Sequence, residues 1–137
     1  MTLEDLEPIA AIEAQAFSEP YRFSMLRQLY EIHGSEWFVA DLDVSVVGYS
    51  LTMEKAGQAL LFTFGVAKDF RHRGYGRVLL EHTMRQYRAL GVRISLTVDP
   101  ENARAVNLYK QAGFVHMRRD PKYFGLDEPR DIYEYPG

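Results

Sequence analysis

The sequence has no cysteine among its 137 residues, which excludes disulfide bonds, thiolate metal sites and a cysteine nucleophile. It also has no apolar run near the roughly 18 residues that a membrane-spanning helix needs. The first ten residues lack a basic segment followed by an apolar one, so we expect no signal peptide and a cytoplasmic location. Internal repeats and flexible linkers are missing as well. We therefore expect one domain over residues 1–137, which is an ordinary domain size.

Basic residues are too few for a general nucleic-acid-binding protein. Lys and Arg together number 16 against 19 Asp and Glu, which gives a formal net charge of −3. We therefore expect neither a nucleic-acid partner nor a membrane partner. One short segment departs from this balance and is strongly basic; its charged residues are Lys68, Arg71, His72, Arg73 and Arg77. Charge alone leaves open whether this segment is a solvated turn or an anion site.

Apolar residues recur at helical spacing near the start of the chain and alternate as in strands after it. Leu6, Ile9 and Ile12 repeat every three to four residues, so we expect an amphipathic helix over residues 4–17. Ser24 is a suitable N-cap for a second helix, which Gly34 would end. An antiparallel meander of three strands follows, and then helix, strand, helix and two strands. We expect these later elements at 37–42, 44–53, 59–66, 74–90, 93–98, 102–112, 114–118 and 131–135.

This mixed order of helices and strands predicts an α/β fold. The longest expected helix, over residues 74–90, has an apolar stripe and a glycine directly after it. The glycine is Gly91, a typical helix stop. The stripe that should face the core consists of Leu79, Leu80, Thr83, Tyr87 and Leu90.

A glycine-rich turn joins the strand at 59–66 to this helix. The first turn of a helix has backbone N–H groups without helical partners, and the helix dipole adds positive charge there. Gly74 and Gly76 lack the Cβ atoms that would keep an anion away from those groups. Arg71, Arg73 and Arg77 can add charged hydrogen bonds. The turn fits a phosphate or pyrophosphate cradle, although it lacks the Walker lysine and the third glycine of a dinucleotide fingerprint. The glycine spacing alone also fits a plain tight turn.

Two motifs in this half of the chain resemble those of the GNAT acetyltransferases. Arg71, Gly74 and Gly76 match Gln/Arg-x-x-Gly-x-Gly/Ala, which in that family holds the pyrophosphate of coenzyme A. The second motif, Asn-x-x-Ala-x-x-Leu-Tyr-x-x-x-Gly-Phe, falls at residues 102–114. The resemblance implies a single N-acetyltransferase domain over 1–137. It also implies a mixed central sheet of about six to seven strands flanked by about four helices.

The resemblance further assigns roles to residues around the two motifs. It implies an enzyme that uses acetyl-CoA, and we expect a monomer or homodimer. The four histidines have no zinc-ligand spacing, so we expect no metal. Tyr109 would protonate the departing CoA thiolate, while packing in the core is the other interpretation of this side chain. The backbone of the 64–66 strand segment would pair with the coenzyme arm, and Asn102 would hydrogen-bond it. The residues expected to bind the coenzyme are Phe64, Gly65, Val66, Arg71, His72, Arg73, Gly74, Tyr75, Gly76, Arg77 and Asn102.

The proton acceptor for the amine is the least defined part of the expected site. Family members that act on N-terminal amines often carry Glu or His twelve residues before the tyrosine. Thr97 stands at that position here, and it cannot take a proton at neutral pH. Either a water chain leads to another group, or the amine arrives neutral. Glu36, Glu54 and His82 are candidates for that other group.

The first fifty residues resemble the branch of the family that acetylates protein N-termini, including the ribosomal-protein alanine acetyltransferases. The resemblance lies in Asp5-Leu6, Ile12-Glu13, Ala16-Phe17 and Pro20-Tyr21. A peptide or protein N-terminus is therefore the expected acceptor. The aromatic residues expected to bind it are Phe17, Tyr21, Tyr123 and Phe124, unless they only pack at the edges of the core.

Two other functions remain open from the sequence. A small cationic amine such as a polyamine or aminoglycoside could be the acceptor, attracted by Asp127, Glu128 and Asp131. The chain could instead bind acyl-CoA without turnover, which the threonine at position 97 favours and Tyr109 disfavours.

Overall fold

The computed structural model describes residues 1–16, 20–42, 45–71, 74–123, 125–126 and 128–135. Within them the chain forms four α-helices, three short 3-10 turns and six strands. The α-helices are α1 (Leu6–Ala16), α2 (Phe23–His33), α3 (Tyr75–Ala89) and α4 (Ala103–Gln111). The strands are β1 (Trp37–Leu42), β2 (Ser45–Lys55), β3 (Gln58–Val66), β4 (Arg93–Val98), β5 (Val115–Asp120) and β6 (Arg130–Tyr135). The 3-10 turns are η1 (Leu3–Asp5), η2 (Gly34–Glu36) and η3 (Lys68–Phe70).

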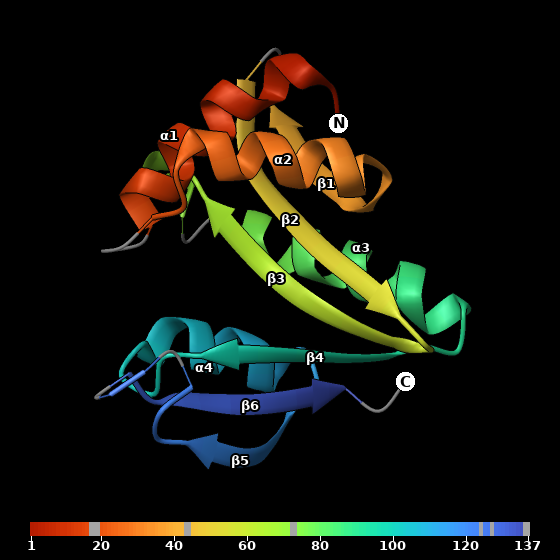
Figure 1. Ribbon diagram of the computed structural model, residues 1–137, viewed down its shortest axis with the longest axis vertical. Helices are drawn as coiled ribbons and strands as arrows, with labels where there is room; N and C mark the ends of the chain where they lie inside the picture. Colours follow the sequence, from red (N-terminus) through yellow and green to blue (C-terminus); the bar gives the residue numbers. More distant parts are fainter. Residues whose placement is uncertain (17–19, 43–44, 72–73, 124, 127, 136–137) are drawn as a thin grey trace. The chain divides into compact units, whose positions relative to one another are not determined.

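The six strands follow the order β1-β2-β3-β4-β6-β5 in one mixed sheet (Figure 1). β1 and β2 pair antiparallel, β3 and β4 pair in parallel, and β6 pairs antiparallel with both β4 and β5. A parallel pair needs a long crossover connection, and α3 lies in the connection from β3 to β4. The expected mixed α/β fold is confirmed. Among the described residues, no helix combines the length and the apolar character that crossing a membrane would require.

The chain divides into two compact units. Unit 1 consists of Met1–Met53 and Phe62–Thr83, and unit 2 consists of Glu54–Leu61 and Met84–Gly137.

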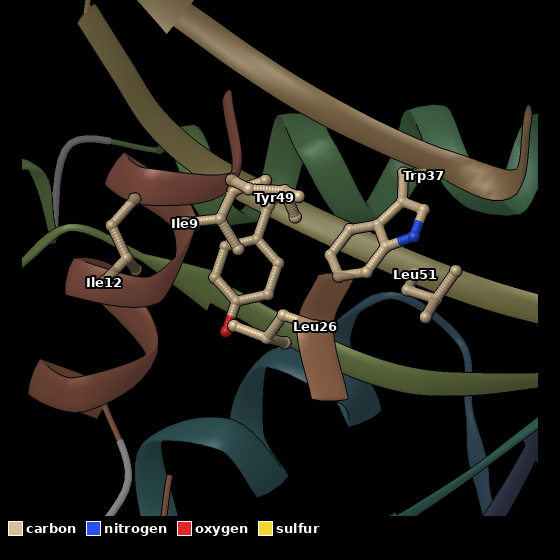
Figure 2. Close-up of a cluster of buried hydrophobic side chains, with 7 residues drawn as sticks. Ile9, Ile12, Leu26, Trp37, Tyr49 and Leu51 are labelled. Atoms are coloured by element: carbon tan, nitrogen blue, oxygen red, sulfur yellow. The ribbon is translucent and has the colours of Figure 1, made fainter. Parts of the chain in front are cut away.

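The core of unit 1 forms where α1 and α2 pack on the strands. Its buried cluster is Leu6, Ile9, Ile12, Leu26, Trp37, Tyr49 and Leu51. Figure 2 shows the ring of Tyr49 among these apolar side chains. Ser50 lies between Tyr49 and Leu51 on β2, so its side chain points to the opposite face of the strand. There its hydroxyl and that of Thr83 on α3 form a hydrogen bond of 2.9 Å. β2 is therefore buried on both faces in unit 1, which explains its continuous run of buried residues rather than a simple alternation.

The core of unit 2 forms between α4 and the strands β4 and β6. Ile94, Leu96 and Val98 alternate with more exposed residues along β4. The rings of Tyr109 and Phe114 meet edge to face with centroids 5.9 Å apart. Phe114 in turn contacts Tyr135 of β6, with centroids 5.8 Å apart. These aromatic contacts fix the C-terminal end of α4 against the β6 strand.

Two details of the expected helices are wrong. Arg22, not Ser24, is the N-cap residue of α2, because the carbonyl of Arg22 accepts the N–H groups of Met25 and Leu26. Leu90 is 67% exposed and does not face the core. The chain turns after α3 through Gly91, at φ +68°, and Val92 rather than Leu90 becomes buried.

Candidate active site

The strand-to-helix turn expected from the sequence is present in unit 1. β3 ends at Val66, η3 follows, and α3 begins at Tyr75. Gly74 precedes α3 with φ +84°, a conformation that residues with a Cβ rarely adopt. Its carbonyl accepts the N–H of Val78 at 3.1 Å, so Gly74 starts the helical ladder. The first backbone N–H groups of α3 therefore lie next to a position without a side chain, as an anion cradle requires.

The basic residues of this turn differ in what they contact. Arg71 folds back, and its Nε donates to the carbonyl of Val66 at 3.1 Å. Arg77 forms an ion pair with Glu81 one helical turn later, at 3.0 Å, and both side chains are largely exposed. Lys68 is exposed. His72 and Arg73 lie outside the described residues, so their expected role in coenzyme binding stays a prediction.

Only the first part of β3 is in the ladder with β4, and the last part of β3 leads into the glycine turn. The parallel ladder joins Gln58–Leu60 to Arg93–Ser95, and β3 continues past that ladder to Val66. The expected coenzyme-binding residues Phe64, Gly65 and Val66 belong to this continuation. These three residues lie in the part of β3 that belongs to unit 1, next to the glycine turn.

Gly65 lies directly against the ring of Tyr49 on the neighbouring strand β2. A Cβ atom at position 65 would lie 2.9 Å from Cε1 of Tyr49 and 3.0 Å from its hydroxyl oxygen. Only glycine fits at this position without displacing the ring. The close approach places the Tyr49 phenol beside the strand segment that was expected to bind the coenzyme arm.

A buried carboxylate meets this phenol, and the sequence reasoning missed it. Glu13 on α1 is only 1% exposed. Its Oε1 accepts a hydrogen bond from the Tyr49 hydroxyl and another from Oγ1 of Thr63 on β3 at 3.0 Å. Its Oε2 accepts the backbone N–H of Tyr21 at 3.0 Å. The structure thus brings together residues of α1, β2, β3 and the segment before α2.

One signal in the sequence marks Glu13 as unusual. It follows the core residue Ile9 by four positions, so it lies on the buried stripe of the helix rather than on its polar face. Charged residues are almost never fully buried unless they have partners. Those partners are distant in sequence, so the stripe alone could not identify them.

In unit 2, the second family motif places Asn102 and Tyr109 on α4. The Asn102 side chain caps the helix by accepting the N–H of Ala105 at 3.2 Å. The Tyr109 side chain is buried, and removal from water raises the pKa of its hydroxyl to about 12. The phenol therefore stays protonated at neutral pH. Packing and proton donation are compatible for this residue, because it is both buried and protonated.

Position 97 and the three candidate proton acceptors lie in different surroundings. Thr97 is half-buried on β4, opposite Ile132 of β6. Glu36 lies 2.8 Å from Nδ1 of His33, and Glu54 is exposed. The exposed His82 packs edge to face on Phe38, with centroids 5.0 Å apart.

The expected acceptor-binding aromatics are only partly described. The ring of Tyr21 stacks on Phe62 of β3, with centroids 5.2 Å apart. Tyr123 is 39% exposed. Phe17 and Phe124 lie outside the described residues, and so does Asp127.

The acidic residues near the C-terminus are engaged with basic partners. Asp131 is buried and accepts two hydrogen bonds from Arg119, at 2.8 and 3.2 Å. His116 adds a contact with Asp131 at 3.3 Å. These bonds, first of all that from Arg119, lower the pKa of the Asp131 carboxyl against the opposing effect of its burial. Glu128 lies 3.7 Å from Arg130.

Comparisons with known proteins agree with the geometry. A model described as the acetyltransferase (GNAT) family matches residues 6–114. An uncharacterized N-acetyltransferase of Methanocaldococcus jannaschii is 29% identical over 123 residues, which cover 88% of this chain and 79% of that protein. An N-alpha-acetyltransferase of Sulfurisphaera tokodaii is 26% identical over an alignment of 150 positions, which covers 98% of this chain and 89% of that protein.

A solved structure extends this likeness to the fold. The ribosomal-protein-S18-alanine N-acetyltransferase of Escherichia coli has a TM-score of 0.87 and 25% identity, over 99% of this chain and 90% of that one. The family match covers both motifs and most of the described elements. The chain therefore belongs to the GNAT family and is an acetyl-CoA-dependent N-acetyltransferase.

Proposed function

We propose that this enzyme acetylates the α-amine at the N-terminus of a peptide or protein, as a single N-acetyltransferase domain over residues 1–137. The observation that carries the proposal is the kinship with an N-alpha-acetyltransferase and with a ribosomal-protein alanine N-acetyltransferase, each covering nearly the whole chain. A cytoplasmic location and a monomeric or homodimeric state belong to the same proposal.

The residues of unit 1 fit the phosphates of acetyl-CoA. Gly74 leaves space at the N-terminus of α3, because among the described residues no atom beyond its chain neighbours lies within 4 Å of the place where its Cβ would be. Arg71 uses its Nε to hold the strand end, and its guanidinium has further N–H donors for an anion. His72, Arg73, Tyr75, Gly76 and Arg77 complete the proposed cradle, and residues 64–66 would bind the coenzyme arm.

Acetyl-CoA supplies the acetyl group as a thioester. Residues 64–66 would orient it through their backbone groups, with an N–H directed at the carbonyl oxygen. As the amine nitrogen bonds to the carbonyl carbon and the carbon–sulfur bond breaks, the Tyr109 hydroxyl would give its proton to the leaving sulfur. The proton lost by the amine passes to solvent, from which Tyr109 recovers its own. Asn102 would bind the coenzyme arm near α4.

An α-amine suits a site without a basic side chain at position 97. The α-amine has a pKa near 8, whereas the lysine side chain has one of about 10.4. At pH 7.5 roughly a quarter of α-amines are therefore neutral, against about one lysine amine in a thousand. Thr97 cannot remove a proton, so the enzyme would depend on the fraction of acceptor that is already neutral.

The rival acceptor, a polycationic small molecule, has less support. Asp131, which was expected to attract it, is buried and bonded to Arg119. Glu128 lies near Arg130, so its charge is also partly balanced. A binding module without turnover is disfavoured by the likeness to proteins named N-acetyltransferases.

The test uses three matched sets of acceptors with acetyl-CoA and follows thiol release. The first set is a peptide library with free N-termini. The second has the same peptides blocked at the α-amine but carrying lysine, and the third contains spermidine and an aminoglycoside. We expect the first set to react at least tenfold faster than the other two. Faster turnover of the spermidine and aminoglycoside set would contradict the peptide proposal. If no set of acceptors caused thiol release, a binding module without turnover would be favoured.

A further inference from the structure

We propose that Glu13 is a positioning residue for the acceptor, which it serves by holding the segment Pro20–Arg22 (the Tyr21 segment) against the strand that binds the coenzyme arm. The inference rests on the proposed function, in which Tyr21 contacts the acceptor. The observation behind it is the buried set of hydrogen bonds from Tyr21, Tyr49 and Thr63 to one carboxylate.

The Glu13 carboxylate is an acceptor surrounded by donors. The Tyr49 and Thr63 hydroxyls both donate to Oε1, and the Tyr21 N–H donates to Oε2. Among the described residues, no lysine, arginine or histidine forms an ion pair with Glu13. Hydrogen bonds alone therefore compensate the loss of hydration at this carboxylate.

A buried carboxylate is a costly way to fill a core. Apolar residues that replace a buried ionic group together with its partners often stabilise a protein as well or better, whereas removal of the carboxylate alone leaves its donors without this acceptor. Glu13 follows the core residues Ile9 and Ile12 on α1, so the buried stripe that it continues is otherwise apolar. Packing therefore does not explain the glutamate, whereas the fixed position of its three donors does.

The three donors are not equivalent. The hydroxyls of Tyr49 and Thr63 can rotate and can also accept hydrogen bonds, so they tolerate a change of partner. The backbone N–H of Tyr21 can only donate, and its direction is set by the chain. The position of the Tyr21 segment is thus the feature that depends most on the oxygen atoms of Glu13.

The other end of the network lies on the strand that was assigned to the coenzyme arm. Thr63 is two residues before Gly65 on β3, and the Tyr49 phenol lies against Gly65 itself. The ring of Tyr21 also stacks on Phe62 of the same strand, with centroids 5.2 Å apart. Glu13 therefore sets the distance between the Tyr21 segment and the β3 residues next to the thioester.

The experiment compares three substitutions of Glu13. In Glu13→Gln the amide oxygen can face the Tyr21 N–H while the amide nitrogen donates to the two hydroxyls, so this variant retains the positions without the charge. Glu13→Met keeps the volume and loses all three bonds. Glu13→Asp keeps the charge but is too short to reach both ends, and it serves if Glu13→Met fails to fold. Glu7→Met makes the same chemical change at an exposed site of α1 and is the matched control.

The first readout separates acceptor binding from coenzyme binding. We expect Glu13→Met and Glu13→Asp to raise the acceptor KM at least tenfold, with the Kd for CoA within twofold of the wild type. Glu13→Gln should restore most of the acceptor affinity and keep the pH profile of kcat/KM. An acceptor KM unchanged in both Glu13→Met and Glu13→Asp would overturn the proposal. So would a Glu13→Gln enzyme that loses turnover and the acidic limb of the profile, because Glu13 would then be accepting a proton.

The second readout needs no substrate. Amide hydrogen exchange at Tyr21 should be slow in the wild type and at least tenfold faster in Glu13→Met, while the amides of β2 remain protected. Equal exchange in the two proteins would refute the role of Glu13. If instead the exchange differs as expected but no N-terminal peptide is acetylated, the proposed acceptor is wrong and the positioning of the Tyr21 segment stands.

Discussion

The side chain of Arg71 returns to the end of its own strand, where its Nε donates to the carbonyl of Val66 at 3.1 Å. The bond closes a loop in which the four residues 67–70 lie between Val66, the last residue of β3, and Arg71. It ties the Arg71 side chain to the end of β3 through Nε alone, and a guanidinium has further N–H donors that can bind an anion. Arg71 therefore has both a structural partner and capacity for a ligand.

Replacing Arg71 with alanine should weaken CoA binding. The loss should be about 1.5–3 kcal/mol, the range for a hydrogen bond to a charged group, which corresponds to roughly a ten- to hundredfold higher Kd. Calorimetric titration with CoA measures it. Arg85→Ala is the matched control, since Arg85 is an exposed arginine of α3 outside the cradle, and it should change the Kd little. Equal effects of the two variants would mean that only overall charge matters.

Gly65→Ala should destabilise unit 1 because the new methyl group would meet the Tyr49 ring at 2.9 Å. Overpacking of this kind costs about 1–3 kcal/mol. Urea unfolding of the single variant and of the Gly65→Ala, Tyr49→Leu pair gives the coupling, and the alanine should cost less once the ring is gone. Gly34→Ala is the control, since its Cβ would have only ordinary contacts at 3.7 Å. Additive effects of the pair would show that the ring is not the obstacle.

Tyr109→Phe should slow turnover without affecting coenzyme binding. Loss of a general acid typically costs about 10²–10⁴-fold in rate. The ring keeps its contacts with Phe114, so the fold of unit 2 should persist. Steady-state kinetics at saturating acceptor would then give a lowered kcat with a KM for acetyl-CoA close to that of the wild type. A kcat within twofold of the wild type would leave packing as the only role of this tyrosine.

The same hydroxyl should make the protein sensitive to alkali. Burial raises the pKa of Tyr109 from 10.0 to about 12, so the folded state holds this proton more tightly than the unfolded chain does. The stability linked to Tyr109 is therefore complete below pH 10 and lost as the pH rises through 12. A shift of this size corresponds to a stability contribution on the order of 3 kcal/mol. Unfolding free energies between pH 9 and 12 should fall more steeply for the wild type than for Tyr109→Phe; parallel curves would contradict the assignment.

The order of helices and strands followed from the sequence because periodicity and turn residues are local. Gly91 and Gly113 end α3 and α4 as expected, and both have positive φ. Leu90 was misplaced because it continues the apolar stripe of α3 while lying beyond the last helical residue. Which residue next to a helix stop becomes buried depends on the path of the chain after the stop, and the sequence pattern contains little of that information.

The contacts of the site depended on residues far apart in the chain. The strand-to-helix turn could be predicted because its parts lie within ten residues, from Val66 to Tyr75. Glu13, Tyr49 and Thr63 meet only once α1 packs on β2 and β3, across separations of 36 and 50 residues. Asp131 was expected to attract a cation from solvent, yet the register of the β5–β6 hairpin places it opposite Arg119. Pairing of this kind needs the strand register, which the sequence did not provide.

The pairing of Asp131 with Arg119 leads to a prediction for acid stability. The pKa of the Asp131 carboxyl lies below its ordinary value of 3.8, chiefly because Arg119 hydrogen-bonds it, while burial acts in the opposite direction. The folded state thus binds this proton more weakly than the unfolded chain does. The linked stability is present above the ordinary pKa and is lost as the pH falls through the lowered one.

Asp131→Asn should therefore have a lower Tm than the wild type at pH 7, and the difference should shrink as the pH falls below about 4. Thermal melts from pH 2 to 7 measure this, with Asp120→Asn as the control, since Asp120 is paired only loosely with Arg118, at 3.9 Å. A Tm difference that stays constant down to pH 2 would mean that the loss comes from the altered side-chain shape and not from the charge of Asp131.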